Sequence, residues 1–192
     1  TEIRQLQEQG LDGQGVRICM VDTGFSPTHS AFEGVEIIFK DMVGDSTEPV
    51  DYGTIGHGTM MAGLLISQNH QIGISPNVTL AVVAALSDNG DGVNSGDEAV
   101  VADAIRWCHQ EFNADIISLS LGGQQKPDSE REGASVSATR MAVDSGIFVV
   151  AAAGNDGGGD DDGMVSAPGN VARVITVGAT TKGGLIWSNS SS

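Results

Sequence analysis

The sequence has 192 residues, of which 25 are acidic and 9 are basic, so its formal net charge is −16. This length suits one domain, and the high glycine count of 27 with only 4% aromatic residues favours an α/β fold over a helical bundle. The acidic balance argues against nucleic acid as a partner, because phosphate binding needs a basic face. No run of 18 apolar residues occurs, so no membrane-spanning helix is expected.

Taken in chain order, the first predicted element is a short amphipathic helix at residues 2–10, which Gly10 ends. The stretch Val16–Asp22 is predicted to be a buried strand that ends in a carboxylate, and Gly24 then permits a sharp turn. Small residues surround His57, and the apolar helical stretch after it places this imidazole near a helix N-terminus. Apolar runs predict further strands at residues 35–39, 78–86, 115–121, 147–153 and 174–177, and periodicity predicts helices at 97–112 and 134–144.

This alternation predicts the fold class as α/β, with three layers and a mostly parallel central sheet that has helices on both faces. In such sheets, sites form beyond the carboxyl ends of the strands. Asp22, His57 and Asn155 each lie where a strand ends or a helix begins. A carboxylate can orient an imidazole, the imidazole can act as a general base, and an amide can donate to an oxyanion. This set of side chains is suited to acyl transfer.

Five segments resemble those of the subtilisin-like serine peptidases, the subtilase family, and they occur in the family's order. They are Val21–Gly24, Gly56–Thr59 with Ala62–Gly63, Ile117–Gly123, Val149–Asn155, and Ser166–Gly169 followed by Val174–Ala179. Because these segments extend over most of the chain, the resemblance is specific. It implies a subtilisin-like fold and a serine endopeptidase that hydrolyses peptide bonds with an Asp-His-Ser triad through an acyl-enzyme.

The resemblance implies a role for each matching residue. Asp22 and His57 would be members of the triad, and Asn155 would be the oxyanion donor. A polypeptide substrate in extended conformation would pair with an exposed backbone edge, as in β-augmentation. That edge consists of Ser120, Leu121 and Gly122, and the residues facing it across the cleft would be Gly90, Asp91 and Gly92.

The same resemblance implies a pocket for the substrate residue before the cut, lined by Ala152, Ala153 and Gly154. Asp156 would lie at the rim of this pocket, where an acid favours a basic or polar side chain. A solvated loop acid is the alternative interpretation of Asp156, since a rim charge in water contributes little.

The family's nucleophile lies in a Gly-Thr-Ser-Met-Ala-type motif after the oxyanion Asn, and this sequence has no such motif. The serines at 188, 190, 191 and 192 lie in a stretch expected to be a flexible tail, without the rigid placement that a nucleophile needs. We therefore expect a single domain at residues 1–192 that is truncated on its C-terminal side and inactive alone. The missing central helix should leave apolar surface exposed, to be covered by the missing C-terminal segment or by another chain.

Cys19 falls in a predicted strand and Cys108 in a predicted helix, and we expect buried free thiols, with a disulfide as the alternative. The family's chemistry requires no cofactor. A structural calcium ion is not supported at the usual loop, because the connection at residues 71–76 looks too short and Ala31 replaces an expected Asp. The three aspartates at 160–162 are interpreted as a solvated loop, with cation binding as the alternative. The resemblance to this family favours a secreted, extracellular protein.

Two other classes of protein compete with this interpretation. Asp22-Thr23-Gly24 after an apolar run is also the signature of aspartic peptidases, but those enzymes need two such carboxylates, and only one Asp-Thr-Gly occurs. The second competitor is a pseudopeptidase that binds extended peptides along Ser120–Gly122 without cutting them. The absent serine keeps this second alternative open.

Overall fold

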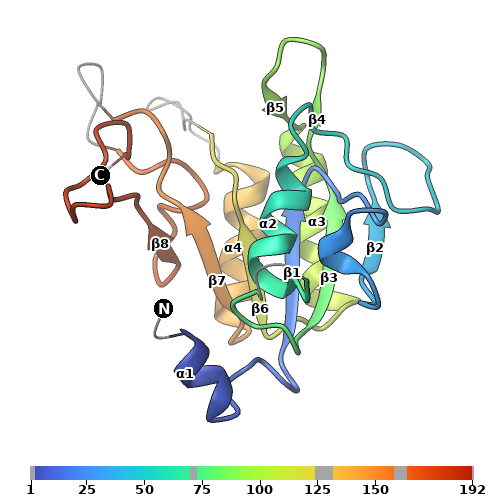
Figure 1. The fold of residues 1–192 in the computed structure, drawn as a ribbon. Helices are drawn as coiled ribbons and strands as arrows, with labels where there is room; N and C mark the ends of the chain where they lie inside the picture. The colour runs from blue at the N-terminus through green and yellow to red at the C-terminus, as the bar shows by residue number, and fades with distance from the viewer. Residues whose placement is uncertain (1–2, 70–72, 124–131, 158–163, 192) are drawn as a thin grey trace.

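A computed structural model describes residues 3–69, 73–123, 132–157 and 164–191. Its centre is a six-stranded sheet in the order β2-β3-β1-β6-β7-β8, and every pairing in this sheet is parallel. The strands are β1 (Arg17–Asp22), β2 (Ile38–Asp41), β3 (Thr79–Ala84), β6 (Ile116–Leu119), β7 (Phe148–Ala152) and β8 (Ile175–Val177). The predicted α/β class with a parallel central sheet is confirmed (Figure 1).

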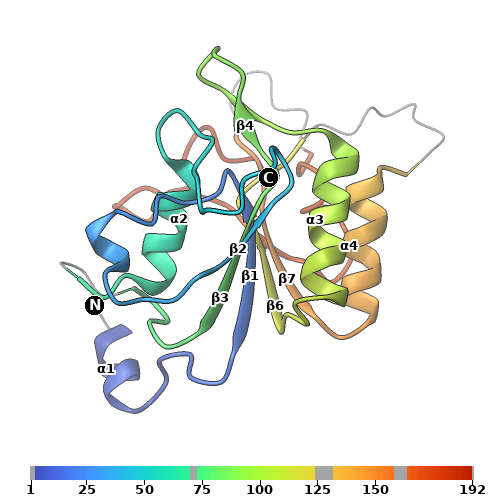
Figure 2. The same cartoon turned by 90° about the vertical axis from the view of Figure 1, so that its right-hand side faces the viewer.

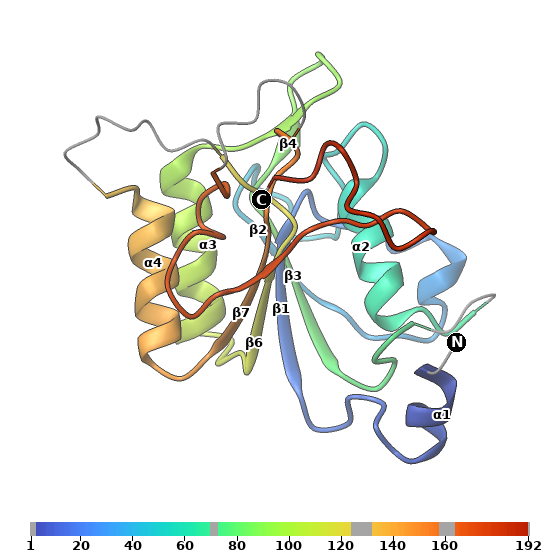
Figure 3. The ribbon, with the colours of Figure 1, turned by 90° about the vertical axis from the view of Figure 1, so that its left-hand side faces the viewer.

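Helices cover both faces of the sheet, as predicted. They are α2 (His57–Ile66), α3 (Glu98–Gln110) and α4 (Ala134–Asp144), with a 3-10 turn η1 (Ser30–Phe32). Helix α1 (Ile3–Glu8) precedes the sheet and has no buried residue. Figure 2 shows the sheet nearly edge-on, with α2 on one side and α3 and α4 side by side on the other. Figure 3 shows the same layers from the opposite side. None of the helices in the described part of the chain is both long and apolar enough to cross a bilayer.

Strand β1 has a separate core on each of its faces, because its side chains alternate between the two layers. On the side of α3 and α4, Cys19 and Val21 belong to the larger apolar core. On the side of α2, Ile18 and Met20 belong to a second core that includes Ile66. A strand buried on both faces reads as a continuous apolar run, which is why β1 was predictable from the sequence.

One face of the sheet is uncovered over its last strands. The register pairs Ile116 with Phe148, and Val150 with Ile175, so these side chains share the face that α2 covers further along the sheet. In Figure 1, α2 lies in front of β1, whereas β7 has no helix in front of it. Phe148 is 64% exposed, Ile175 50% and Val177 52%. Exposed apolar residues are therefore present, as expected for a chain without the family's central helix.

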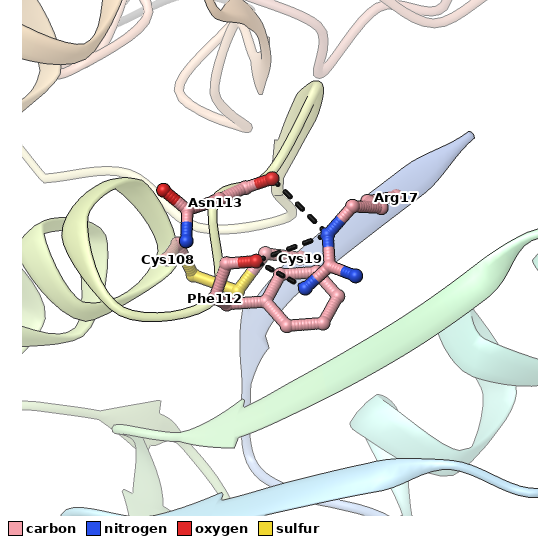
Figure 4. Close-up of a disulfide and its surroundings, with 5 residues drawn as sticks. All are labelled: Arg17, Cys19, Cys108, Phe112 and Asn113. Atoms are coloured by element: carbon pink, nitrogen blue, oxygen red, sulfur yellow. Dashed lines mark hydrogen bonds between the residues drawn. A yellow bond between two sulfur atoms is a disulfide. The ribbon is translucent and has the colours of Figure 1, made fainter. Parts of the chain in front are cut away.

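A disulfide joins β1 to α3, and the expectation of free thiols was wrong (Figure 4). Cys19 points towards the α3 layer, and Cys108 lies on the buried stripe of α3, so their Cα atoms are 5.7 Å apart. Arg17, at the start of β1, donates hydrogen bonds to the carbonyl oxygens of Phe112 and Asn113 and stacks over the Phe112 ring. The disulfide and Arg17 together hold the C-terminal end of α3 against the sheet.

Two expected loops have more order than the sequence indicated. Residues 87–96 contain a small antiparallel hairpin, β4 (Ser87–Asp88) with β5 (Asn94–Ser95), because the Asp88 side chain accepts N–H bonds from three residues of the turn. The serine-rich end is packed rather than flexible: Ser190 is 5% exposed and Ser191 is 3% exposed. The second strand starts at Ile38 instead of residue 35, because the N–H of Val35 is still bonded to Phe32 in a turn.

Candidate active site

The three predicted catalytic side chains come from different elements. Asp22 is the last residue of β1, His57 is the first residue of α2, and Asn155 follows β7 by three positions. The carboxyl ends of parallel strands meet at one edge of the sheet. Asp22 and Asn155 therefore lie at this edge, and the structure places His57 there too, because α2 begins next to the end of β1.

His57 and Asp22 form a hydrogen-bonded pair, with Nδ1 of His57 2.7 Å from Oδ1 of Asp22. Asp22 is completely buried, whereas the His57 side chain is 27% exposed. The N–H of Thr23 donates to the same Oδ1, and the buried Oδ2 has no hydrogen-bond partner among the described residues. The carboxylate thus favours the tautomer with a proton on Nδ1, which leaves the Nε2 lone pair available as a base.

The pair shifts the protonation of the imidazole. The hydrogen bond to Asp22 raises the pKa of His57 above its ordinary value of 6.5. Burial of the ring lowers the pKa, but the negative charges of Asp22 and Asp51 act in the same direction as the hydrogen bond, and the net shift is upward. Raising the pKa stabilises the imidazolium, which is the form that His57 takes after it accepts a proton.

A second carboxylate, Asp51, holds the backbone around this pair. Its Oδ1 accepts from the hydroxyl of Thr23 at 2.6 Å and from the N–H of Gly53 at 2.9 Å. Its Oδ2 accepts from the N–H and the hydroxyl of Thr59, at 2.9 and 2.5 Å. The Thr23 hydroxyl in turn accepts from the N–H of Gly58. Asp51 was not predicted, because it lies in a polar stretch without any local pattern.

Glycines allow the two loops to approach this closely. A Cβ on Gly58 would lie 2.0 Å from the carbonyl oxygen of Gly24, and a Cβ on Gly24 would lie 2.0 Å from that of Val50. Gly56 has φ 62° at the N-cap of α2, in the left-handed region that favours glycine. The glycines on either side of His57 are therefore needed to bring the imidazole to Asp22.

A cleft of about 440 Å³ opens beside the pair. Five predicted residues line it together: His57, Asn155, Ser120, Leu121 and Gly122. Gly123, which follows the 120–122 edge, forms two backbone hydrogen bonds with Ala167, each with an N···O distance of 2.9 Å. The other lining residues are Leu86, Asn94, Ser95, Gly96, Glu98, Val101, Gly123, Ser135, Ala167 and Pro168.

Other predicted site residues lie outside this cleft. Gly90, Asp91 and Gly92 are exposed in the turn of the β4–β5 hairpin, and the residues that line the cleft from this hairpin are 94–96 instead. The three residues predicted to line the pocket before the cut, Ala152, Ala153 and Gly154, and the predicted rim residue Asp156 are also not among the residues that line this cleft.

The C-terminal segment packs against the loop that carries Asn155. The N–H of Ser191 donates to the carbonyl of Gly154, and the hydroxyl of Ser191 accepts from the N–H of Asp156 at 3.1 Å. Ser166 lies beside the same loop, because a Cβ on Gly154 would lie 2.5 Å from its hydroxyl oxygen. Within the described part of the chain, no serine hydroxyl forms a hydrogen bond with His57.

The sequence did not support a structural calcium ion at the usual loop, and this remains a prediction. Residues 3–69, 73–123, 132–157 and 164–191 contain no group of three or more His, Cys, Asp or Glu side chains that could hold a metal ion. The aspartates at 160–162 and residues 71–72 of the connection lie outside the described residues.

Comparison with known proteins identifies the family to which the chain belongs. A sequence model described as the Subtilase family matches residues 13–192. The chain belongs to the subtilase family. It is 40% identical over 183 residues to Serine protease AprX of Bacillus subtilis (strain 168), a match that covers 89% of this chain. It is 31% identical over 181 residues to Subtilisin DY of Bacillus licheniformis, with 91% of this chain covered.

Solved structures agree with this assignment. The crystal structure of a cold adapted subtilisin-like serine proteinase superposes with a TM-score of 0.75 at 31% identity, and the match covers 93% of this subtilase chain and 60% of that protein. The chain spans 39% of the length of AprX and 60% of the length of Subtilisin DY. It therefore corresponds to only part of each of these relatives.

Proposed function

We propose that the complete protein is a serine endopeptidase and that the 192-residue chain alone does not hydrolyse peptides. The observation that carries this proposal is the 2.7 Å hydrogen bond between His57 and the fully buried Asp22 at the edge of the cleft. Membership of the subtilase family supports it. The nucleophilic serine would come from a segment that follows Ser192, and the chemistry needs no cofactor.

In the proposed mechanism, Nε2 of His57 takes the proton of the serine hydroxyl while the serine oxygen attacks the scissile carbonyl carbon. The side-chain N–H of Asn155 donates to the oxyanion that forms. His57 then gives its proton to the leaving amine, and the C–N bond breaks to leave an acyl-enzyme. A water molecule, deprotonated by His57, attacks the ester; the ester C–O bond breaks, the acid product leaves, and His57 returns the proton to the serine oxygen. Asp22 keeps Nδ1 protonated and stabilises the imidazolium throughout.

The proposed substrate is a polypeptide in extended conformation. Its backbone would lie along Ser120, Leu121 and Gly122, which line the same cleft as His57 and Asn155. We assign the pocket for the residue before the cut to Ala152, Ala153 and Gly154, with Asp156 at its rim. The exposed sheet face at Phe148 and its neighbours would be covered by the missing C-terminal segment or by another chain.

A fluorophosphonate probe tests the proposal, since it labels only an activated serine. The complete gene product should be labelled at one serine, and His57→Ala should abolish the labelling. The 192-residue chain should not be labelled and should not turn over a peptide substrate. A folded complete product that resists labelling would overturn the peptidase assignment.

One observation favours a second candidate, a pseudopeptidase that binds extended peptides without cutting them. Within the described residues no hydroxyl hydrogen-bonds to His57, so the part of the chain that the structure describes shows the base without a nucleophile. The same probe separates the two functions. Saturable binding of a peptide by an unlabelled complete product would favour the pseudopeptidase.

We also propose an extracytoplasmic location. A buried disulfide such as Cys19–Cys108 persists most readily in an oxidising compartment. Detection of the protein in the culture medium, with both cysteines resistant to alkylation, would support this location. Its retention in the cytoplasm with free thiols would contradict it.

A further inference from the structure

We propose that Glu98 selects substrates with a basic side chain, arginine above all, at one position away from the scissile bond. This inference rests on the proposed function, because it takes the cleft as the channel for an extended peptide. Glu98 lines the same cleft as His57 and Asn155. It is the only carboxylate among the described residues that line this cleft, and no described lysine or arginine lines it.

Glu98 stands on the opposite side of the sheet from the catalytic pair. It is the first residue of α3, whereas His57 is the first residue of α2, and these helices cover opposite faces of the sheet (Figure 2). The cleft therefore crosses the carboxyl edge of the sheet from one layer to the other. A peptide with its scissile carbonyl beside His57 and Asn155 would extend across this edge and bring a different side chain to Glu98.

The carboxylate is held in place by hydrogen bonds from one neighbour. Its Oε1 accepts from the N–H of Ser135 at 2.9 Å and from the Ser135 hydroxyl at 2.7 Å. Gly133 leaves the necessary room, since a Cβ there would lie 2.6 Å from Oε1. Both of these bonds go to one oxygen, and Oε2 has no hydrogen bond within the described part of the chain. One oxygen thus fixes the group, and the other can accept from a ligand.

The charge on Glu98 has no countercharge in the surroundings that the structure describes. None of the salt bridges among the described residues includes Glu98. Arg106, a basic residue on the same helix, pairs with Asp103 instead. A fixed carboxylate that has one oxygen free and no cationic partner among the described residues is complementary to a guanidinium or an ammonium group. The net charge of −16 would attract cationic peptides in general, whereas Glu98 would make the preference specific to a position away from the cut, separate from the pocket that has Asp156 at its rim.

Glu98 also stabilises the start of α4, because it accepts from the N–H of Ser135 and the N-cap residue Gly133 has no side chain that could do so. A purely structural role is therefore the competing explanation, and the test must separate the two. Glu98→Gln keeps an oxygen acceptor for Ser135 and removes the charge. Asp103→Asn is the matched control, since it removes one negative charge from an exposed position on the same helix.

The experiment compares peptides that differ only in one arginine or its uncharged isostere citrulline, with the exchange moved through successive positions. For the complete product, we expect kcat/KM to favour arginine by about 3- to 10-fold at one position, as a partly exposed charge pair allows. Glu98→Gln should reduce this ratio to about 1 and Glu98→Lys should reverse it, whereas Asp103→Asn should retain it. Equal kcat/KM for arginine and citrulline at every position overturns the role of Glu98.

Fluorescence anisotropy with the same labelled peptides distinguishes failure of this proposal from failure of the proposed function. A complete product that cuts nothing but still binds arginine peptides more tightly, with a preference lost in Glu98→Gln, supports the role of Glu98 and rejects peptidase activity. A product that cuts both peptides equally rejects the role of Glu98 alone. A folded product that neither cuts nor binds rejects both.

Discussion

The carboxylate of Asp51 binds Thr59 twice, through the backbone N–H at 2.9 Å and through the hydroxyl at 2.5 Å. Because Thr59 lies two positions after His57 in α2, this contact fixes the start of the helix that carries the imidazole. The other oxygen of Asp51 binds the hydroxyl of Thr23, next to Asp22. Asp51 therefore connects both members of the His57–Asp22 pair without touching a substrate.

We expect Asp51→Asn to lower kcat/KM of the complete product and to destabilise the fold by about 1–3 kcal/mol, since four charge-assisted hydrogen bonds weaken. Loss of the Asp51 charge should also lower the pKa of His57. Urea unfolding and a pH–rate profile measure the two effects. Glu48→Gln, an exposed acid in the same loop, is the control and should change neither. Wild-type values in Asp51→Asn would contradict the connecting role.

Asp22→Asn tests the tautomer that the buried carboxylate imposes. The amide can present its NH₂ group to Nδ1 and so favour the tautomer with the proton on Nε2, which cannot accept a proton from serine. We expect kcat to fall by about 10,000-fold, the loss known for the equivalent exchange in chymotrypsin-like triads. Far-ultraviolet circular dichroism of the variant checks that the fold survives. Activity within about tenfold of wild type would refute the role of Asp22.

The pH dependence follows from the direction of the His57 shift. The base must be neutral, so kcat/KM should rise with pH through an apparent pKa above 6.5, and this limb should move to lower pH in Asp22→Asn. Because folding raises the pKa of His57, protonation adds stability below about pH 6.5, and this contribution disappears as the pH rises through the folded value. Nuclear magnetic resonance titration of the His57 ring measures the shift directly.

Tyr52, the only tyrosine in the sequence, reports on the loop before Asp51. Its hydroxyl donates to Asp41 at 2.6 Å, and this bond raises the pKa of Tyr52 to about 12. The contribution of the bond to stability is complete below about pH 10 and is lost as the pH rises through 12. Phenolate absorbance should titrate near this value, and Asp41→Asn should return it towards about 10. Asp45→Asn, which removes only a nearby charge, should cause the smaller change.

Removal of the disulfide by the paired change Cys19→Ala and Cys108→Ala should lower the free energy of unfolding by about 2–5 kcal/mol, because the bond closes a long loop with a sequence separation of 89. Urea unfolding with and without reductant measures this loss. Reductant should destabilise the wild type and leave the paired variant unchanged. Equal unfolding midpoints for the two proteins would show that the bond contributes nothing.

The uncovered sheet face predicts that the 192-residue chain associates when it is isolated. Phe148 and Val177 are exposed on this face, and exposed apolar surface of this kind favours association. Sedimentation should give a mass that rises with concentration, and Phe148→Thr with Val177→Thr should reduce the rise. Leu11→Thr, at an exposed position before β1, is the control. A compact, stable monomer of the wild-type chain would contradict the prediction.

The order of strands and helices could be predicted because each core strand is a continuous apolar run with glycine or polar residues after it. The end of β1 placed Asp22 at the functional edge of the sheet, but its contact with His57, at the start of α2, was expected from the resemblance to the subtilase family. The role of Asp51 could not, because its partners are distant in sequence and its own segment has no periodicity. The Cys19–Cys108 bond depends on how α3 packs on β1, and no local pattern encodes this packing.

The amino-acid composition of two segments, residues 87–96 and the serines near residue 190, led to wrong predictions of their local structure. Residues 87–96 are rich in Asp, Asn and Gly, which predicts a loop, but the side chain of Asp88 organises them into a hairpin. The serines near residue 190 suggested a flexible tail, yet they pack against the loop at Gly154, because their hydroxyls and backbone groups find partners there. In both segments tertiary hydrogen bonds override the preference that the residue types indicate.

The backbone bond from Ser191 to Gly154 holds the last described residue beside the loop that carries Asn155, and a continuing polypeptide would start there. Gly154 is the residue directly before Asn155. A nucleophile delivered by such a continuation would need only a short tether, and a short tether keeps the local concentration of its reactive group high. Breaking the hydrogen bonds of Ser191 to Gly154 and Asp156 should therefore release the loop that carries Asn155.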